Sequence, residues 1–548
     1  MDNANILNKI YNFNDEAKVW LKKDAPAFFY SDGDQVEKAI GDALKSVKDR
    51  SVFSDELKLL QNGWAATYYF SANRANLLRP LAKRLLHGAR VLELGCGMGA
   101  LTRYLGESCK EVVAVEGSAR RASVAALRCE DLPNVTILVD DIRQLPAELG
   151  QFDVVTLIGV LEYSRRYGGA GSEEEILKLV RSFLTPTGSL ILALENKLGL
   201  KYFAGVPEDH IPRPFLGLTN GYSPNGVQTW SRKELAQMLR NAGFNNQDQF
   251  ISLPDYKLPT SIISPEGLKA SGGKFNLFDI MTAIQRPYEK LPLFNMAEAW
   301  ESVIKAGLLP DLADSLCFVA SGADRPSPFE PGELAVIYSS TGNILRKYAK
   351  EIKILEENGK IRVQKRKLFP EEATSNYKQV VEDEPYYEGR LLLSEIRKIT
   401  MRPDWTLEEL FNALQPWYKM LYDNMDAEGY CDGELLDLVP FNIIMNNGKA
   451  KAFDLEWQTD KKIPITVLLH RGLFNTLMRI MPIRRSSKHN VSTFQELFQK
   501  FMATQNVPAS FPLSPDYLAW QETKFQEVLR GNKIRMKPIK DFNILYMP

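Results

Sequence analysis

The sequence has few cysteines, no excess of charge of either sign and no long apolar run. Its 548 residues include 5 cysteines, and no two of them form a CxxC pair, which argues against a disulfide framework and against a zinc site. No run approaches the roughly 18 apolar residues that cross a bilayer, and the segment Met1 to Ile10 does not resemble a secretory signal. We therefore expect a protein of the reducing cytoplasm.

The charges of the chain cancel, since Lys and Arg number 68 and Asp and Glu also number 68. A chain without a basic field does not hold a duplex by electrostatics, so this balance disfavours general nucleic-acid binding, and an anionic substrate has to meet a local patch. The hydrophobic content of 45% is that of a globular protein. At about 100–200 residues per domain, the length suggests two to four domains.

Residues 61–250 alternate short apolar runs with amphipathic segments, and residues 1–60 before them are polar and predict a helical lead-in. Strands are expected at 90–95, 111–117, 134–141, 152–160 and 188–196, and helices at 100–109, 119–130, 172–184 and 231–244. Such alternation is typical of repeated βαβ units. We predict an α/β doubly wound, Rossmann-like domain with a parallel sheet.

The second half of the chain is interpreted as a separate domain. Residues 251–332 read as a connecting region that ends in a Pro- and Gly-rich linker. From residue 333 onward, three strand-like runs predict a meander, and an apolar hairpin is expected around Asn446-Asn447-Gly448. We expect an α+β domain over 333–480 and a helical C-terminal extension over 481–548.

The first predicted strand ends in a glycine-rich loop, Glu93-Leu94-Gly95-Cys96-Gly97-Met98-Gly99. Glycines let the backbone turn sharply and approach a ligand, and the helix that follows offers free N–H groups at its N-terminus. With Ala100 the loop also satisfies GxGxxA, so a dinucleotide-binding dehydrogenase is an alternative. Glu93 favours a different ligand, because a carboxylate repels a pyrophosphate and attracts the ammonium group of an amino acid.

Acidic residues close the next two predicted strands. Glu116, followed by Gly117, stands where an acid can accept hydrogen bonds from both ribose hydroxyls. Asp141 is placed to accept from an adenine amino group while Ile142 packs on the ring. The set predicts a ligand built from a nucleoside and an amino acid. For any one residue the alternative remains that the glycines only shape a turn and the acids are solvated strand ends.

These motifs resemble those of the class I S-adenosylmethionine-dependent methyltransferases, including a fourth strand, FDVVTLIGV, that contains Gly159 and a late Pro-Gly turn before the fifth strand. The resemblance implies S-adenosylmethionine as cofactor, bound by Glu93, Gly95, Gly97, Gly99, Glu116, Gly117, Asp141, Ile142 and Gly159. The phrases RANLLRPL, LTRYLGE and ENKLGLKYFAG also resemble a subgroup from bacterial surface-polysaccharide biosynthesis, which implies a sugar hydroxyl or a sugar phosphate as acceptor.

The segment after the fifth predicted strand carries three cationic side chains, Lys197, Lys201 and Arg213, and the titratable His210. Loops at the carboxyl ends of parallel strands are where ligands bind, so we expect an anionic or glycan acceptor here. His210 is the candidate catalytic residue, either as a base or as a donor to an anion. The alternative is a surface histidine beside a solvated acid pair.

Asp437 and Asn442 lie close in sequence, and Asp454 follows the predicted hairpin. A phosphoryl-transfer site needs an acid near the substrate hydroxyl, and an Asn and an Asp that hold magnesium on the phosphates. The pattern resembles the protein-kinase and aminoglycoside-phosphotransferase superfamily. The resemblance implies Asp437 as catalytic base, Asn442 and Asp454 as Mg²⁺ ligands, Lys365 or Lys367 as the lysine on the ATP phosphates, and Glu388 as its helix partner.

Leu435 and Val439 depart from the kinase pattern, so a catalytically inactive binding or scaffold module is the alternative for this domain. A methyltransferase followed by a kinase resembles the bifunctional enzymes that terminate O-antigen chains in lipopolysaccharide biosynthesis. That resemblance implies polysaccharide-assembly proteins as partners and a location in the cytoplasm or at the surface of the inner membrane. Residues 471–489 are basic and apolar at helical spacing, which favours a packed helix, with a helix on an anionic membrane surface as the alternative.

Overall fold

The computed structural model describes residues 3–23, 33–271, 273–283, 292–338, 344–370, 375–505, 514–531 and 542–547. It divides into two compact units. The first comprises Met1–Lys269 and Gly307–Arg346, and the second comprises Ala270–Ala306 and Lys347–Pro548. The predicted boundary at residue 333 therefore differs from the structure, because most of the segment expected to be a linker folds with one unit or the other.

The centre of the first unit is a parallel sheet. Its strands are β3 (Arg90–Leu94), β4 (Glu111–Glu116), β5 (Val135–Val139), β6 (Phe152–Ile158) and β7 (Leu184–Glu195), in the spatial order β5-β4-β3-β6-β7. The chain moves outward from β3 to β5 and then returns to place β6 on the other side of β3. This confirms the predicted Rossmann-like domain and puts its topological switch point at the carboxyl end of β3.

Antiparallel strands extend this sheet beyond the predicted part. Strand β10 (Ser315–Ser321) pairs with β7 and with β8 (Asn246–Leu253), and β9 (Ser261–Ile263) pairs with β8 and with β11 (Glu333–Ile337). Residues 315–337 were expected to lie in the linker or in the second domain. They join the first unit because their strands are apolar and almost fully buried.

The lead-in of residues 1–60 is not purely helical. Strands β1 (Tyr11–Asn14) and β2 (Val19–Lys22) form a hairpin, and β2 continues the sheet parallel to β5. Tyr11 and Val19 are buried, and the Tyr11 hydroxyl donates a 2.6 Å hydrogen bond to Asp140. This pairing with a distant strand is a tertiary contact that the local pattern does not contain.

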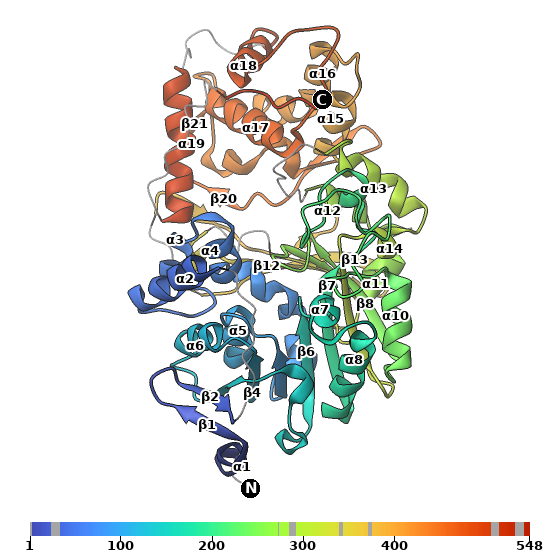
Figure 1. Ribbon diagram of the computed structural model, residues 1–548. Helices are drawn as coiled ribbons and strands as arrows, with labels where there is room; N and C mark the ends of the chain where they lie inside the picture. The colour runs from blue at the N-terminus through green and yellow to red at the C-terminus, as the bar shows by residue number, and fades with distance from the viewer. Residues whose placement is uncertain are drawn as a thin grey trace. The chain divides into compact units, whose positions relative to one another are not determined.

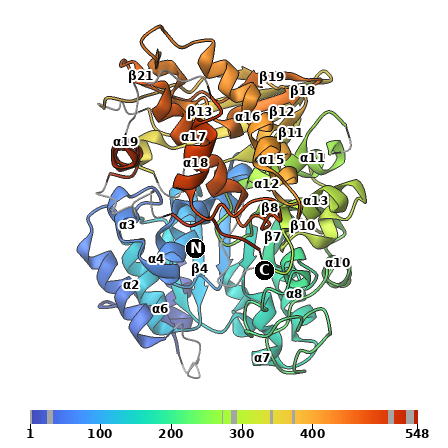
Figure 2. The same cartoon turned by 90° about the horizontal axis from the view of Figure 1, so that it is seen from above.

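The predicted helices of the first unit are present as α5 (Ala100–Ser108), α6 (Ala119–Arg128), α8 (Ser172–Phe183) and α10 (Arg232–Asn241). Helix α2 (Asp34–Ser46) packs against α6, and the two lie side by side in Figure 1 and Figure 2. The remaining helices are α1 (Asn3–Ile10), α3 (Asp55–Leu59), α4 (Gly63–Phe70), α7 (Ser164–Gly168), α9 (Leu200–Phe203), α11 (Pro265–Ala270) and α14 (Leu309–Leu312). One buried apolar cluster lies between the sheet and α8 and α10, and a second lies among α2, α4, α5 and α6.

The second unit is an α+β unit. Strands β12 (Lys350–Glu357) and β13 (Lys360–Lys367) form an antiparallel hairpin, and β13 also pairs with β15 (Glu384–Pro385). Strands β18 (Ile443–Asn446) and β19 (Lys449–Ala452) flank Asn447 and Gly448, both at positive φ, as the sequence predicts for a tight hairpin turn. The short strands are β14 (Lys378–Gln379), β16 (Arg390–Leu391), β17 (Tyr430–Cys431), β20 (Trp457–Gln458) and β21 (Ile463–Pro464).

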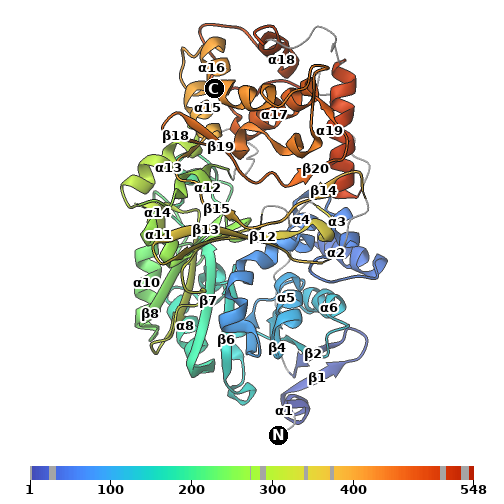
Figure 3. The same cartoon turned by 180° about the vertical axis from the view of Figure 1, so that it is seen from behind.

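The helices of the second unit are α12 (Leu277–Ala283), α13 (Met296–Lys305), α15 (Leu392–Thr400), α16 (Leu407–Tyr422), α17 (Ile465–Ile480), α18 (Phe494–Met502) and α19 (Pro515–Arg530). Helices α16 and α18 both pack on α17, and all three lie together in Figure 3. Most residues of α17 are buried, including Arg471. This burial favours the packed-helix interpretation of the basic segment that starts at residue 471. Among the described helices, none is both long and apolar enough to span a bilayer.

Candidate functional site

A cavity of about 570 Å³ opens at the switch point of the first unit. Gly95, Gly97 and Glu93 line it on the side of the glycine loop, and Glu195 and His210 line it on the other side. A second cavity of about 130 Å³ is lined by Glu116, Gly117, Asp141, Ile142 and Gly159. Gly95 and Gly159 belong to both walls, so the two cavities adjoin and together present eight of the nine residues predicted to bind the cofactor.

The glycine loop has the backbone that its sequence predicts. Gly95, Gly97 and Gly99 have φ values of +77°, +58° and +82°, a region that side chains rarely adopt. Gly99, the ninth predicted residue, acts through packing, because a Cβ there would lie 2.9 Å from the Cα of Ala125 in α6. The loop therefore needs glycine for its conformation and for its close approach to the neighbouring helix.

Glu116 holds the loop in place. Its carboxylate accepts hydrogen bonds from the backbone N–H of Gly97 at 2.9 Å and of Ser118 at 3.0 Å. Gly95 and Cys96 donate to the carbonyl of Val115 at the end of the same strand. The second strand thus positions the glycine loop as well as lining the smaller cavity.

Glu93 lies at the end of β3 and is only 4% exposed. Burial raises the pKa of its carboxyl to about 7. Its Oε2 has no hydrogen-bond partner among the described residues, although a buried carboxylate oxygen without one is costly. An ammonium group bound in the cavity would satisfy it, so the residue fits the amino-acid end of S-adenosylmethionine.

His210 lies among carboxylates. Its Nδ1 is 3.1 Å from Oε1 of Glu208, and its Nε2 is 3.8 Å from both Glu162 and Glu195. Burial alone would lower the pKa of His210, but these three carboxylates raise it to about 9. Sequence reasoning named His210 but missed Glu162 and Glu195. The signal for Glu195 was present, since it ends the fifth parallel strand as Glu93 ends the first.

The lysines predicted to receive an anion are held in ion pairs. Lys197 Nζ lies 2.8 Å from Glu234, and Lys201 Nζ lies 2.6 Å from Asp209. Both lysines are buried, whereas Arg213 in the same segment is exposed. Lys257, which the sequence analysis did not name, bridges Asp209 at 2.8 Å and Glu195. The cavity wall around His210 therefore carries several carboxylates, and Lys201 and Lys257 are held in ion pairs with them.

In the second unit, the structure brings together the residues predicted for phosphoryl transfer. Asn442 Nδ2 donates to the carbonyl oxygens of Asp437 at 3.1 Å and of Asp454 at 3.2 Å. Lys365 Nζ pairs with Asp454 Oδ1 at 2.7 Å. Burial raises the pKa of the Asp437 carboxyl to about 6. The four residues thus form one polar cluster.

Two members of that cluster differ from the prediction. The glutamate that pairs with Lys365 is Glu384, at 2.7 Å, and not Glu388, whose partner is Lys274 at 3.5 Å. A second lysine, Lys350, also binds Asp454, at 2.9 Å. Lys350 and Glu384 lie on β12 and β15, which both pair with β13, the strand of Lys365. The spacing of residues along the sequence does not show this pairing.

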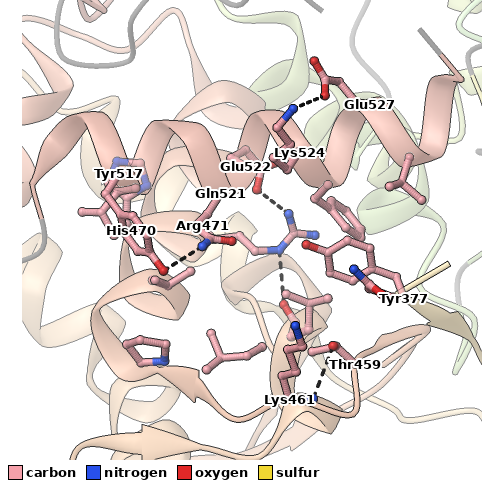
Figure 4. Close-up of a pocket in the computed structure, with 18 of the residues that line it drawn as sticks. Tyr377, Thr459, Lys461, His470, Arg471, Tyr517, Gln521, Glu522, Lys524 and Glu527 are labelled. Carbon is pink, nitrogen blue, oxygen red and sulfur yellow. Dashed lines mark hydrogen bonds and ion pairs between the residues drawn. The ribbon is translucent and has the colours of Figure 1, made fainter. Parts of the chain in front are cut away.

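A larger cavity, of about 810 Å³, lies beside this cluster in the second unit. Figure 4 shows Arg471 and Glu522 paired in its wall, with Lys524 and Lys461 nearby. Arg471 NH2 also lies 3.4 Å from Asp437 Oδ1, so one guanidinium links the cavity wall to the predicted catalytic acid.

The first unit is similar in sequence to known methyltransferases. Residues 65–249 match a family model described as a methyltransferase domain. A ubiquinone biosynthesis O-methyltransferase of Xanthomonas campestris pv. campestris (strain B100) is 31% identical over 170 residues, which cover 30% of this chain and 67% of that protein. A cyclopropane-fatty-acyl-phospholipid synthase of Escherichia coli (strain K12) is 36% identical over 124 residues, 22% of this chain and 30% of that protein.

The ubiquinone biosynthesis O-methyltransferase of Xanthomonas euvesicatoria pv. vesicatoria (strain 85-10) is 31% identical to 30% of this chain. The match spans 65% of the length of that relative. Among solved structures, the CcbJ methyltransferase from Streptomyces caelestis is 16% identical, with 50% of this chain and 100% of that chain covered and a TM-score of 0.30. The sequence match places the chain, through its first unit, in the S-adenosylmethionine-dependent methyltransferases. That unit is a class I methyltransferase domain.

Proposed function

We propose that the first unit transfers a methyl group from S-adenosylmethionine to a hydroxyl oxygen of a glycan. The observation that carries this proposal is the pair of adjoining cavities at the switch point, one lined by the predicted nucleoside-binding residues and the other by Glu93 and a cluster of carboxylates. The cofactor supplies an activated methyl group on its sulfonium. The chain's own residues have to bind both molecules and take up the proton of the hydroxyl.

The cofactor would be held in extended form across the two cavities. Glu116 would accept hydrogen bonds from the ribose hydroxyls, and Asp141 with Ile142 would bind the adenine ring, since all three line the smaller cavity. Glu93, with its unpartnered Oε2, would pair with the ammonium group. Gly97 lines the larger cavity without a side chain, so the backbone of the loop could approach the amino-acid part of the cofactor closely.

The acceptor side suits a polyhydroxyl compound. Carboxylates such as Glu162 and Glu195 accept hydrogen bonds from sugar hydroxyls, and the aromatic side chains Trp64, Tyr68 and Tyr163 offer faces on which the apolar side of a sugar ring can stack. Transfer to a hydroxyl forms a C–O bond, breaks a C–S bond and releases one proton. A carboxylate in the cavity wall can take up that proton.

The charge of the acceptor is a separate matter. Lys197 and Lys201 are already held in ion pairs, which favours a neutral acceptor terminus over an anionic one.

Labelled methyl transfer to defined oligosaccharides tests this proposal. We expect label in oligosaccharides with a free terminal hydroxyl and none in the same compounds with that hydroxyl already methylated. Glu195→Gln should reduce the turnover number at least tenfold while keeping S-adenosylhomocysteine affinity. Label that enters only phosphorylated termini would favour the anionic acceptor, and label that enters a phenol but no sugar would exclude the glycan.

We propose as a second function that the second unit transfers a phosphoryl group from ATP. The convergence of Asp437, Asn442, Asp454 and Lys365 supports this proposal. The amide nitrogen of Asn442 is used in hydrogen bonds to two backbone carbonyls, so its Oδ1 would be one magnesium ligand. The Asp454 carboxylate would be the other once Lys350 and Lys365, which donate to it, turn to the phosphates. Lys365 would contact the phosphates, and Asp437 would orient the acceptor hydroxyl and accept its proton.

The relevant experiment measures ATP binding and phosphate transfer by the full chain. We expect magnesium-dependent ATP binding in the wild type and its loss in Asp454→Ala. Asp437→Asn should keep ATP binding and lose transfer. ATP binding without transfer in the wild type would favour the inactive binding module, and the absence of ATP binding would remove the second function.

A further inference from the structure

Three potential metal-ligand groups meet in the wall of the larger cavity of the first unit. A carboxylate oxygen of Glu162, one of Glu195 and a ring nitrogen of His210 all lie within 4.8 Å of one another. They come from three elements, namely the turn Leu161–Tyr163 after β6, the end of β7 and the segment after α9. The two glutamates are each 1% exposed.

The distances in this cluster are too long for hydrogen bonds. His210 Nε2 lies 3.8 Å from Glu162 Oε1 and 3.8 Å from Glu195 Oε2, whereas N–H···O hydrogen bonds span about 2.7–3.2 Å. Ligand atoms that each lie about 2.0–2.2 Å from one metal ion are separated by roughly 3–4 Å. The two distances of 3.8 Å from the histidine nitrogen to the glutamate oxygens are therefore compatible with ligands around one cation.

Two buried carboxylate oxygens in the cluster lack hydrogen-bond partners. Oε2 of Glu162 and Oε2 of Glu195 have no hydrogen-bond partner among the described residues, and both glutamates line the cavity. The other oxygen of Glu195 is used, since Lys257 pairs with Oε1 and the Tyr256 hydroxyl donates to it at 3.2 Å. A buried carboxylate oxygen that faces a cavity without a donor indicates a cationic or donor ligand.

The imidazole is held as in many metal sites. Glu208 Oε1 lies 3.1 Å from His210 Nδ1, and Glu208 Oε2 accepts hydrogen bonds of 2.7 Å from the backbone N–H groups of His210 and Ile211. A carboxylate that accepts from one ring nitrogen fixes the ring and its tautomer and leaves the other nitrogen as a ligand. Here that other nitrogen is Nε2, which faces Glu162 and Glu195, and a bound cation would take the place of its proton.

We propose that Glu162, Glu195 and His210 bind one divalent first-row transition-metal cation, of which Mn²⁺ is the representative, in the acceptor side of the methyltransferase cavity. The imidazole and carboxylate donors suit Mn²⁺ or Zn²⁺, and three protein ligands leave open positions toward the cavity. The cation would hold the oxygen of the acceptor hydroxyl there. This role rests on the proposed methyl transfer, whereas the binding of the cation does not.

Manganese titration of the full chain, followed by the electron paramagnetic resonance signal of free Mn²⁺, tests the site. The Asp454→Ala background removes the candidate magnesium site of the second unit. We expect one bound Mn²⁺ per chain in this background. Glu195→Gln and His210→Ala should each weaken Mn²⁺ binding at least tenfold, and Glu208→Ala about 10–100-fold through loss of the orienting carboxylate. Glu148→Gln, an exposed site in the same unit, is the control and should not change it.

S-Adenosylhomocysteine binding by the same variants shows whether they are folded. Absence of Mn²⁺ binding in a chain that binds S-adenosylhomocysteine overturns the metal site and leaves the methyltransferase proposal intact. Mn²⁺ bound with unchanged affinity in both Glu195→Gln and His210→Ala also overturns the site. Mn²⁺ bound as expected by a chain that does not bind S-adenosylhomocysteine contradicts the proposed function instead.

Discussion

Burial changes the acidity of Glu93, a residue that we propose binds the cofactor. A carboxyl group at the carboxyl end of a central parallel strand has little water around it, and burial raises its pKa to about 7. Its charge therefore changes over the neutral pH range. The same residue lines the larger cavity beside Gly95 and Gly97, where the amino-acid part of the cofactor is expected.

This shift predicts a pH-dependent cofactor affinity. Below about pH 7 the Glu93 carboxyl is neutral, and above it the carboxylate attracts the ammonium group of the ligand, so affinity should rise with pH. We expect the dissociation constant of S-adenosylhomocysteine, measured by calorimetry, to fall severalfold between pH 6 and pH 8. Glu93→Gln should remove most of this dependence, and Glu148→Gln should retain it. An unchanged pH profile in Glu93→Gln would assign the dependence to another group.

Cavity residues that close a strand could be predicted from the sequence, whereas residues that reach a cavity or cluster only through tertiary contacts could not. Glu116 and Asp141 were predicted because each closes an apolar run. Glu162 was missed, because nothing in its local sequence indicates that the loop of His210 folds onto it. Lys350 was missed because only the pairing of β12 and β13 brings it to Asp454.

Elements with a strong local signal were predicted well. Strands β3 to β7 are apolar runs of a sheet buried on both faces, and α5, α6, α8 and α10 have amphipathic sequences. The hairpin of β1 and β2 was missed because each strand has only four residues and β2 joins the sheet through pairing with the distant strand β5. The division of the chain was also missed, since residues 270–306 leave the first unit and residues 307–346 return to it.

Helix α10 begins with a capping box, which gives an element-scale prediction. Ser231 Oγ accepts from the Glu234 N–H, and the Glu234 carboxylate accepts from the Ser231 N–H at 2.7 Å. Ser231→Ala should lower the free energy of unfolding by about 1 kcal/mol, because the backbone N–H of Glu234 loses the hydroxyl that accepts its hydrogen bond. Chemical denaturation of the first unit measures it. Ser182→Ala, at an exposed position near the end of α8, is the matched control and should cost less than about 0.5 kcal/mol.

At the scale of the whole molecule, the chain joins two units with separate ligand chemistries. The first has the adjoining cavities that we propose for S-adenosylmethionine and a hydroxyl acceptor, and the second has the cluster of Asp437, Asn442 and Asp454 that we propose for magnesium and phosphates. The residues proposed to bind S-adenosylmethionine all belong to the first unit, and those proposed to bind magnesium and ATP all belong to the second.

This separation predicts independent loss of the two binding activities. Asp454→Ala should bind S-adenosylhomocysteine with wild-type affinity and fail to bind magnesium-ATP in calorimetry. Gly97→Arg should show the reverse pattern. A single substitution that abolishes both activities in a chain with native circular dichroism would contradict the assignment of one ligand to each unit.

The measurement that tests the central claim most directly is calorimetric titration of the wild-type chain and of Gly97→Arg with S-adenosylhomocysteine. The wild type should bind one molecule per chain, and a free concentration 100 times the dissociation constant should add about 2.7 kcal/mol to the stability of the first unit. Gly97→Arg places a side chain at a φ of +58° in the cavity wall and should abolish binding without changing the circular dichroism spectrum. Absence of binding by the wild type, or equal affinity in Gly97→Arg, would contradict the account.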